Sequence, residues 1–142
     1  MSQKPDSGNV LYLEVENVLD LYADLFGLND QQVRDRLRDE AGLRGTLSRP
    51  QSYAHYEEAD VAMQAAVLAH GVAEGQYFLE GNKRTALITL RTFLQLNGYS
   101  VRASQQQRAG WILALSQGLP VSDLAARIRQ SLVEIGPAAE SP

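Results

Sequence analysis

The fold is decided by residues 57–98, which read EEADVAMQAAVLAHGVAEGQYFLEGNKRTALITLRTFLQLNG. The first part of this stretch, residues 57–75, is rich in alanine, which favours helix and permits close approach between helices. We therefore expect a central helix there that ends at Gly75. The last part, residues 84–97, repeats apolar residues at helical spacing and is followed by a glycine, which predicts a second helix. The stretch thus predicts two core helices joined by a short loop.

Glycine, proline and polar residues also divide the rest of the chain into helices, because they mark helix starts and ends. The expected elements are a helix over 14–26 ended by Gly27, a helix from Asn29 or Asp30 to Gly42, a short helix over 43–49, a loop over 50–56, an extended piece at 98–102, a helix over 105–117, and a last helix capped by Ser122 with Leu124, Ile128, Leu132 and Ile135 on one face. The predicted class is all-α, with about six to seven helices. One domain is expected over 10–135, with flexible tails at 1–9 and 136–142.

Composition predicts one compact soluble domain. A chain of 142 residues, 44% hydrophobic and 21% charged, buries enough surface to fold without a disulfide bond or a structural metal. The absence of cysteine excludes a disulfide scaffold, a thiolate metal site and a cysteine nucleophile. No apolar run approaches the roughly 18 residues of a membrane span and no secretory signal is visible, so we expect a cytoplasmic protein without a membrane partner. Aromatic residues make up only 7%, which disfavours direct nucleic-acid binding by base stacking.

Charge is distributed unevenly along the chain, whose formal net charge is -4. Residues 1–74 carry thirteen acidic and six basic groups, whereas residues 75–119 carry a single acid, Glu80. The basic residues of this second segment are Lys83, Arg84, Arg91, Arg102 and Arg108. A positive segment with one carboxylate predicts a phosphate or metal-phosphate site, with ordinary surface scatter as the alternative.

The loop between the two core helices combines several features of an anion site. Gly81 permits a backbone conformation that directs consecutive N–H groups into one concavity. The next helix begins at about Asn82, so its free N–H groups and positive dipole end favour an anion, and Lys83 and Arg84 add full charges there. Glu80 is a lone carboxylate suited to hold Mg²⁺ against phosphate oxygens. A capped helix with solvated basic residues is the simpler alternative.

This loop resembles the motif of the Fic/Doc family, whose pattern is His-x-Phe-x-Asp/Glu-Gly-Asn-Lys/Gly-Arg. The matching residues, in order and spacing, are Phe78, Glu80, Gly81, Asn82, Lys83 and Arg84. Residues 47–51, 85–87 and 93–99 also look like the family, and the likeness covers about residues 11–134. The resemblance implies a Fic/Doc-like helical bundle with an anion-binding loop between two central helices.

With lysine at position 83, the chain resembles the Doc (death-on-curing) branch of the family, which is the toxin of a toxin–antitoxin pair. Nucleotidyl-transferring Fic enzymes usually have glycine at this position. The Doc-type resemblance implies a phosphotransferase that uses ATP and Mg²⁺ and modifies a hydroxyl of translation elongation factor Tu. An AMP-transferring Fic enzyme is the alternative. No internal inhibitory Ser/Thr-x-x-x-Glu-Gly/Asn pattern is present, so the resemblance implies inhibition in trans by a small antitoxin whose disordered tail folds on the toxin.

Site roles follow from the same resemblance, position by position. Glu80 would help to hold Mg²⁺, and Phe78 would anchor the loop in the core. The implied nucleotide- and phosphate-binding residues are Gly81, Asn82, Lys83 and Arg84, of which Arg84 would also be catalytic. Residues 50–56, with Tyr53, His55 and Tyr56, would form part of a flap that aligns the target protein. Arg91, one heptad beyond Arg84, either extends the phosphate site or is a surface arginine.

One position departs from the family pattern, because Gln76 stands where the family has its general-base histidine. An amide side chain has no pKa near neutrality and cannot take the proton of a target hydroxyl, a function typically worth about 10²–10⁴-fold in rate. Three interpretations stay open: an introduced inactivating change, a natural loss that leaves a binding or regulatory protein, or another group acting as base. The two histidines, His55 and His70, are expected to contact target or solvent and to be structural, respectively.

Overall fold

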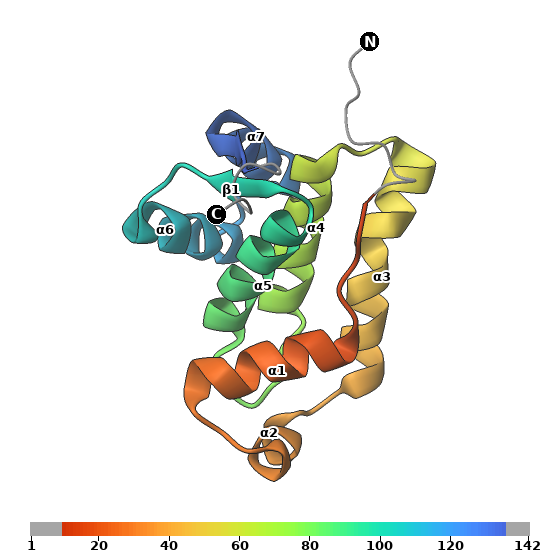
Figure 1. The fold of residues 1–142 in the computed structure, drawn as a ribbon, viewed down its shortest axis with the longest axis vertical. Helices are drawn as coiled ribbons and strands as arrows, with labels where there is room; N and C mark the ends of the chain where they lie inside the picture. The colour runs from red at the N-terminus through yellow and green to blue at the C-terminus, as the bar shows by residue number, and fades with distance from the viewer. Residues whose placement is uncertain (1–9, 136–142) are drawn as a thin grey trace, which may run out of the picture.

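Residues 10–135 are the part of the chain that the computed structural model describes, and they form helices with one small two-stranded sheet (Figure 1). In chain order the elements are α1 (Val15–Phe26), α2 (Asp30–Arg36), α3 (Glu40–Glu57), α4 (Val61–Glu74), α5 (Asn82–Leu96), β1 (Tyr99–Val101), α6 (Gln105–Ser116), α7 (Val121–Ser131) and β2 (Leu132–Glu134). The predicted all-α class with six to seven helices is confirmed. The tails expected at 1–9 and 136–142 lie outside the described residues.

Helix α4 is the centre of the fold, packed against α3, α5 and α7 (Figure 1). Its alanines Ala62, Ala65, Ala66 and Ala69 are completely buried, so the predicted central helix is confirmed. It begins at Val61 rather than at residue 57, because the Asp60 carboxylate caps it by accepting a hydrogen bond from the Met63 N–H at 2.9 Å. Helices α3 and α4 approach closely at Gly71, where an added Cβ would lie 2.6 Å from the Thr46 side chain.

The prediction for residues 30–56 is wrong in its boundaries. The second helix ends at Arg36 and not at Gly42, because the chain leaves the helix at Leu37 to pair with Phe78 in an antiparallel bridge. A new helix then begins at Glu40, where the Asp39 side chain accepts a hydrogen bond from the Gly42 N–H at 2.9 Å.

Residues 43–49 and 50–56 are not a short helix and a loop but parts of the single helix α3. The buried residues of α3 recur at helical spacing, namely Leu43, Thr46, Leu47, Pro50 and Ala54. Burial of this continuous stripe outweighs the one backbone hydrogen bond that Pro50 cannot donate. Tyr53, His55 and Tyr56 therefore lie on a helix.

The C-terminal prediction is corrected in the same way. The extended piece expected at 98–102 is confirmed as β1, which pairs antiparallel with β2 in the register Tyr99–Glu134, Ser100–Val133 and Val101–Leu132. Because of this pairing the last helix stops at Ser131, so Leu132 and Ile135 are not on its face. Its N-cap is Pro120 rather than Ser122, and the Pro120 carbonyl accepts the first helical hydrogen bonds.

Candidate active site

The loop between α4 and α5, residues 75–81, is paired with the link between α2 and α3. The Arg38 N–H donates to the Tyr77 carbonyl at 2.7 Å, and the Leu79 N–H donates to the Arg36 carbonyl at 2.8 Å. Between these two hydrogen bonds, Leu37 and Phe78 form the antiparallel bridge. The path of the loop is thus fixed by a segment about forty residues earlier in the chain.

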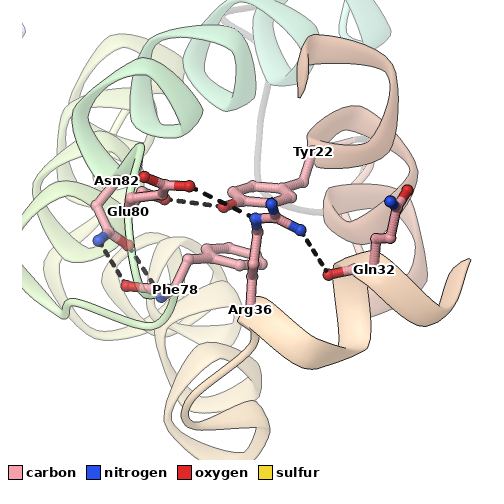
Figure 2. A network of polar contacts seen from close by, with 6 residues as sticks. All are labelled: Tyr22, Gln32, Arg36, Phe78, Glu80 and Asn82. Atoms are coloured by element: carbon pink, nitrogen blue, oxygen red, sulfur yellow. Dashed lines mark hydrogen bonds and ion pairs between the residues drawn. The ribbon is translucent and has the colours of Figure 1, made fainter. Parts of the chain in front are cut away.

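Phe78 anchors the loop in the core, as the resemblance implied. Its side chain is 0% exposed and stacks on the Tyr22 ring of α1, with centroids 4.0 Å apart and an interplanar angle of 9°. The Tyr22 hydroxyl donates to the Glu80 carbonyl at 2.9 Å (Figure 2). Burial raises the pKa of Tyr22, the positive charge of Arg36 lowers it to a smaller extent and the negative charge of Glu80 raises it. The hydroxyl therefore stays protonated and able to donate at neutral pH.

The Asn82 side chain clamps the same loop from the first residue of α5. Its Oδ1 accepts from the Phe78 N–H at 3.1 Å, and its Nδ2 donates to the Phe78 carbonyl at 2.9 Å (Figure 2). Asn82 is only 8% exposed. Its amide thus holds the loop through both its oxygen and its nitrogen, so the Asn82 side chain has a structural role here.

Gly81 precedes α5 in a conformation that requires glycine. Its φ is +79°, in the left-handed region, and an added Cβ would lie 2.3 Å from Phe26 Cζ. As the N-cap residue it has no side chain to accept the first N–H groups of α5, and within residues 10–135 no other side chain accepts them. The N-terminus of this 15-residue helix therefore has unsatisfied donors and the positive end of its dipole open to an anion.

Charged side chains surround this helix start. Lys83 and Arg84 are exposed in its first turn, and the Arg84 guanidinium carbon lies 4.8 Å from the centroid of the Phe26 ring. The Glu80 side chain is 69% exposed, and one of its carboxylate oxygens lies 3.5 Å from Arg36 Nε. The loop thus presents two cations and one carboxylate to solvent on a backbone that is fixed from behind.

Arg36, like Tyr22, is a residue at the site that the sequence did not predict. Its Nη1 donates to the Gln32 carbonyl at 3.2 Å, which holds the guanidinium between α2 and Glu80 (Figure 2). No local pattern distinguishes Arg36 from its neighbours Arg34 and Arg38. Only the pairing of the α2–α3 link with the loop brings it to the carboxylate.

Gln76 lies at the exposed start of the loop. Its φ is +57°, which is uncommon for a residue other than glycine, and its carbonyl lies 3.5 Å from Arg38 Nη1 as a weak acceptor. Histidine and asparagine adopt this left-handed region more readily than most residues. The backbone at position 76 is therefore compatible with the histidine of the family pattern.

The three residues expected to form a target flap are not brought to the loop. Tyr53, His55 and Tyr56 lie at the end of α3, beside the start of α4, whereas the loop follows the end of α4 (Figure 1). A 14-residue helix spans about 21 Å, so the two places are far apart. The His55 and Tyr56 rings contact each other edge to face at 4.5 Å, and both residues line a hollow of about 350 Å³ with Ser48, Gln51 and Ser52.

A metal at the loop would have one protein carboxylate. Within residues 10–135, no group of three or more histidine, aspartate or glutamate side chains lies together as a metal site. Mg²⁺ bound together with a nucleotide takes one or two carboxylates and fills its other positions with phosphate oxygens and water. Glu80 alone is compatible with that mode of binding. Over the same residues, no helix is long and apolar enough to cross a membrane.

The sequence model of the Fic/DOC family matches residues 12–94, which includes α1 to α4, the loop and most of α5. Because the match covers more than half of the chain, the chain belongs to the Fic/DOC family. Membership indicates a Fic-type transferase that modifies a protein target. A search of curated proteins found no match to this chain.

Proposed function

We propose that the chain has the scaffold of a Doc-type toxin, a cytoplasmic phosphotransferase that uses ATP and Mg²⁺. Its target is a protein hydroxyl, with translation elongation factor Tu as the expected target protein, and a small antitoxin inhibits it in trans. The observation that supports this function best is the start of α5. There, Gly81 leaves the helix N-terminus uncapped while Lys83, Arg84 and Glu80 stand beside it in the order of the family motif.

The donor set of the loop fits a nucleotide polyphosphate. The free N–H groups of α5, with Lys83 and Arg84, would bind phosphate oxygens, and Glu80 would hold the cation. When bound, ATP supplies the γ-phosphoryl group and Mg²⁺ neutralises charge on its oxygens. The chain positions the phosphates on a backbone fixed by Asn82 and Tyr22, which is the main contribution a protein makes to phosphoryl transfer.

In the proposed reaction the hydroxyl oxygen of the target bonds to the γ-phosphorus, the bond to the β-phosphate oxygen breaks, and ADP leaves. The hydroxyl proton needs an acceptor, and the Gln76 amide is not one. Arg36 and Arg38, the cations nearest the loop from α2 and its link, are also unable to accept a proton. We therefore expect the chain as it stands to bind nucleotide and to transfer phosphate very slowly.

Gln76 also favours a second candidate function, a nucleotide-binding or regulatory protein without transferase activity. In that case the phosphate site is retained and the transfer step is lost. The two candidates share the binding site and differ only in whether a histidine at position 76 restores transfer. AMP transfer, the third alternative, differs in which phosphate reaches the target.

The test compares the chain with its Gln76→His and Gln76→Asn variants. Each is incubated with Mg²⁺, elongation factor Tu and ATP labelled at the α or the γ phosphate, and label on the target is measured. Gln76→His should raise transfer of the γ label by about 10²–10⁴-fold, whereas Gln76→Asn, which also adopts the left-handed backbone readily, should not. Transfer of the α label would identify an AMP transferase. Absence of transfer by all three proteins, with nucleotide binding intact, would favour the regulatory protein.

A further inference from the structure

Three of the five basic residues between positions 75 and 119 are not at the loop. Lys83 and Arg84 lie at the start of α5, but Arg91 lies two turns later in the same helix, about 10 Å further along its axis. There it lines a cavity of about 30 Å³ together with Arg108 of α6. The other lining residues are Leu94, Gln95, Ser100 and Val101. Arg91 therefore belongs, with Arg108, to a second positively charged region of the protein that is separate from the loop.

The Arg108 side chain is held at the cavity by a hydrogen bond to the chain just before its own helix. Its Nη1 donates to the Ala103 carbonyl at 2.5 Å, while its Nε is buried and has no hydrogen-bond partner within residues 10–135. Burial lowers the pKa of Arg108, and the positive charge of Arg91 lowers it further. A buried N–H donor without an acceptor is rare and unfavourable, so an acceptor at this place would stabilise the fold.

Among the described residues, no carboxylate forms an ion pair with either guanidinium group. The ion pairs formed within residues 10–135 lie elsewhere, and none includes Arg91 or Arg108. Gln95 and Ser100, which line the same cavity, have side chains that can donate hydrogen bonds. This group of side chains has two positive charges and several hydrogen-bond donors. A negatively charged acceptor would therefore bind favourably among them.

We propose that the cavity between α5, β1 and α6 binds a small oxyanion, a phosphate or carboxylate group. A volume of about 30 Å³ accommodates about two water-sized atoms, which matches two oxygens of such a group. The bound oxygens would accept from the guanidinium groups of Arg91 and Arg108, the two charged residues that line the cavity. This site is independent of the proposed function, because neither arginine is part of the loop.

The test is a titration of the full-length chain with inorganic phosphate, and separately with acetate, followed by two-dimensional ¹H–¹⁵N NMR. Signals of Ser100, Val101 and the arginine Nε–H groups report on the cavity, and those of residues 81–84 report on the loop in the same spectra. We expect saturable shifts at the cavity with phosphate, with acetate or with both. Response to phosphate alone identifies a phosphate site, and response to acetate identifies a carboxylate site.

Three variants decide whether the two arginines form the site. Arg91→Gln and Arg108→Gln should each weaken binding at the cavity by about tenfold or more, because each removes a charged donor. Arg102→Gln, which removes an exposed arginine of the same segment that does not line the cavity, should change it by less than about twofold. If Arg108→Gln does not fold, Arg91→Gln still gives the answer, since the Arg91 side chain forms none of the ion pairs within residues 10–135. Equal weakening by Arg102→Gln, or no saturable shift at the cavity with either anion, would overturn the proposal.

Discussion

The loop over 75–81 and the second half of α3, residues 50–57, both expose most of their side chains, yet they are held in different ways. The backbone of α3 is held by its own helical hydrogen bonds, and Pro50 and Ala54 are the buried residues of this half of the helix. The loop has no such internal support. Its backbone is held by Arg36, Arg38, Tyr22 and the Asn82 side chain, which come from three other places in the chain.

The way the backbone is held distinguishes the end of α3, an ordinary helix surface, from the loop, the candidate site. The end of α3 offers exposed aromatic rings on an ordinary helix, and its exposure needs no special support. At the loop, exposed Glu80 and Lys83 are attached to a backbone that buried residues fix in place. A fixed backbone beneath exposed charged groups is what preorganised binding of a phosphate requires. The comparison predicts that changes behind the loop cost far more than matched changes on α3.

The largest effect is expected from two aromatic truncations. Phe78→Ala removes a completely buried ring that stacks on Tyr22, and should lower the free energy of unfolding by about 3–5 kcal/mol. Tyr56→Ala removes a ring that is 77% exposed, and should change it by less than about 0.5 kcal/mol. Urea unfolding of both variants measures the difference. Similar values for the two would show that the loop is not anchored as described.

The next effect is expected from two glycines with positive φ. Gly81→Ala places a Cβ 2.3 Å from Phe26 Cζ at a φ of +79°, so left-handed strain and overpacking together should cost about 2–4 kcal/mol. Gly27→Ala, at a φ of +66° with nothing within 4 Å of the added Cβ, should cost only the strain, about 1–2 kcal/mol. Thermal unfolding compares the two. A larger loss for Gly27→Ala would contradict the close contact behind the loop.

A smaller effect is expected from Tyr22→Phe, which removes the hydrogen bond to the Glu80 carbonyl and should cost about 1 kcal/mol. It also changes the response to alkali. The pKa of Tyr22 is raised above its ordinary value of 10.0, so below pH 10 both states keep the proton, and above it the unfolded state loses its proton first. Stability should therefore fall as pH rises above 10, and less steeply in Tyr22→Phe.

Tyr12→Phe is the control for that change, because it also removes a tyrosine hydrogen bond, from Tyr12 to Gln64, away from the loop. Burial raises the pKa of Tyr12 as well, so this variant should show a similar change with pH. Nucleotide binding, measured by calorimetry, should weaken in Tyr22→Phe and not in Tyr12→Phe. The reverse order would show that Tyr22 does not position the loop.

The smallest effect is expected from Arg36→Gln. The ion pair with Glu80 is partly exposed, and pairs of this kind are worth up to about 1 kcal/mol. Removing Arg36 frees the carboxylate, so the Mg²⁺ concentration needed for half-maximal nucleotide binding should fall by about two- to fivefold. Arg34→Gln, on the same helix but paired with Glu40, should leave it unchanged. A rise for Arg36→Gln would show instead that Arg36 itself binds phosphate.

The two central helices could be predicted from the sequence because the features that define them lie within each helix itself. The buried alanines of α4 and the apolar spacing of α5 need no knowledge of distant residues. The error over 50–56 arose because Pro50 and the polar and aromatic residues after it are typical of a loop. The stripe from Leu43 to Ala54 continues through Pro50 at helical spacing and was the signal for a helix. Strand β2, by contrast, exists only through its pairing with β1, which no local pattern encodes.

The same distinction holds for the site. The motif placed Glu80, Gly81 and Lys83 at the start of a helix, because helix starts and glycine conformations are local properties. Tyr22 and Arg36 were not predicted, since each reaches the loop through tertiary packing from α1 or α2. The motif therefore indicated the charged groups at the helix start and the Phe78 anchor, and it could not indicate the supports that come from α1 and α2.

The proposed function requires that the start of α5 bind nucleotide phosphates even though position 76 is not a histidine. The most direct measurement is calorimetric titration of the chain as it stands with ATP in the presence of Mg²⁺. Saturable one-to-one binding is expected, weakened about tenfold or more by Lys83→Gln and by Arg84→Gln, and left within about twofold by Arg127→Gln, an exposed arginine of α7. Absence of binding, or equal weakening by all three variants, would contradict the proposed function.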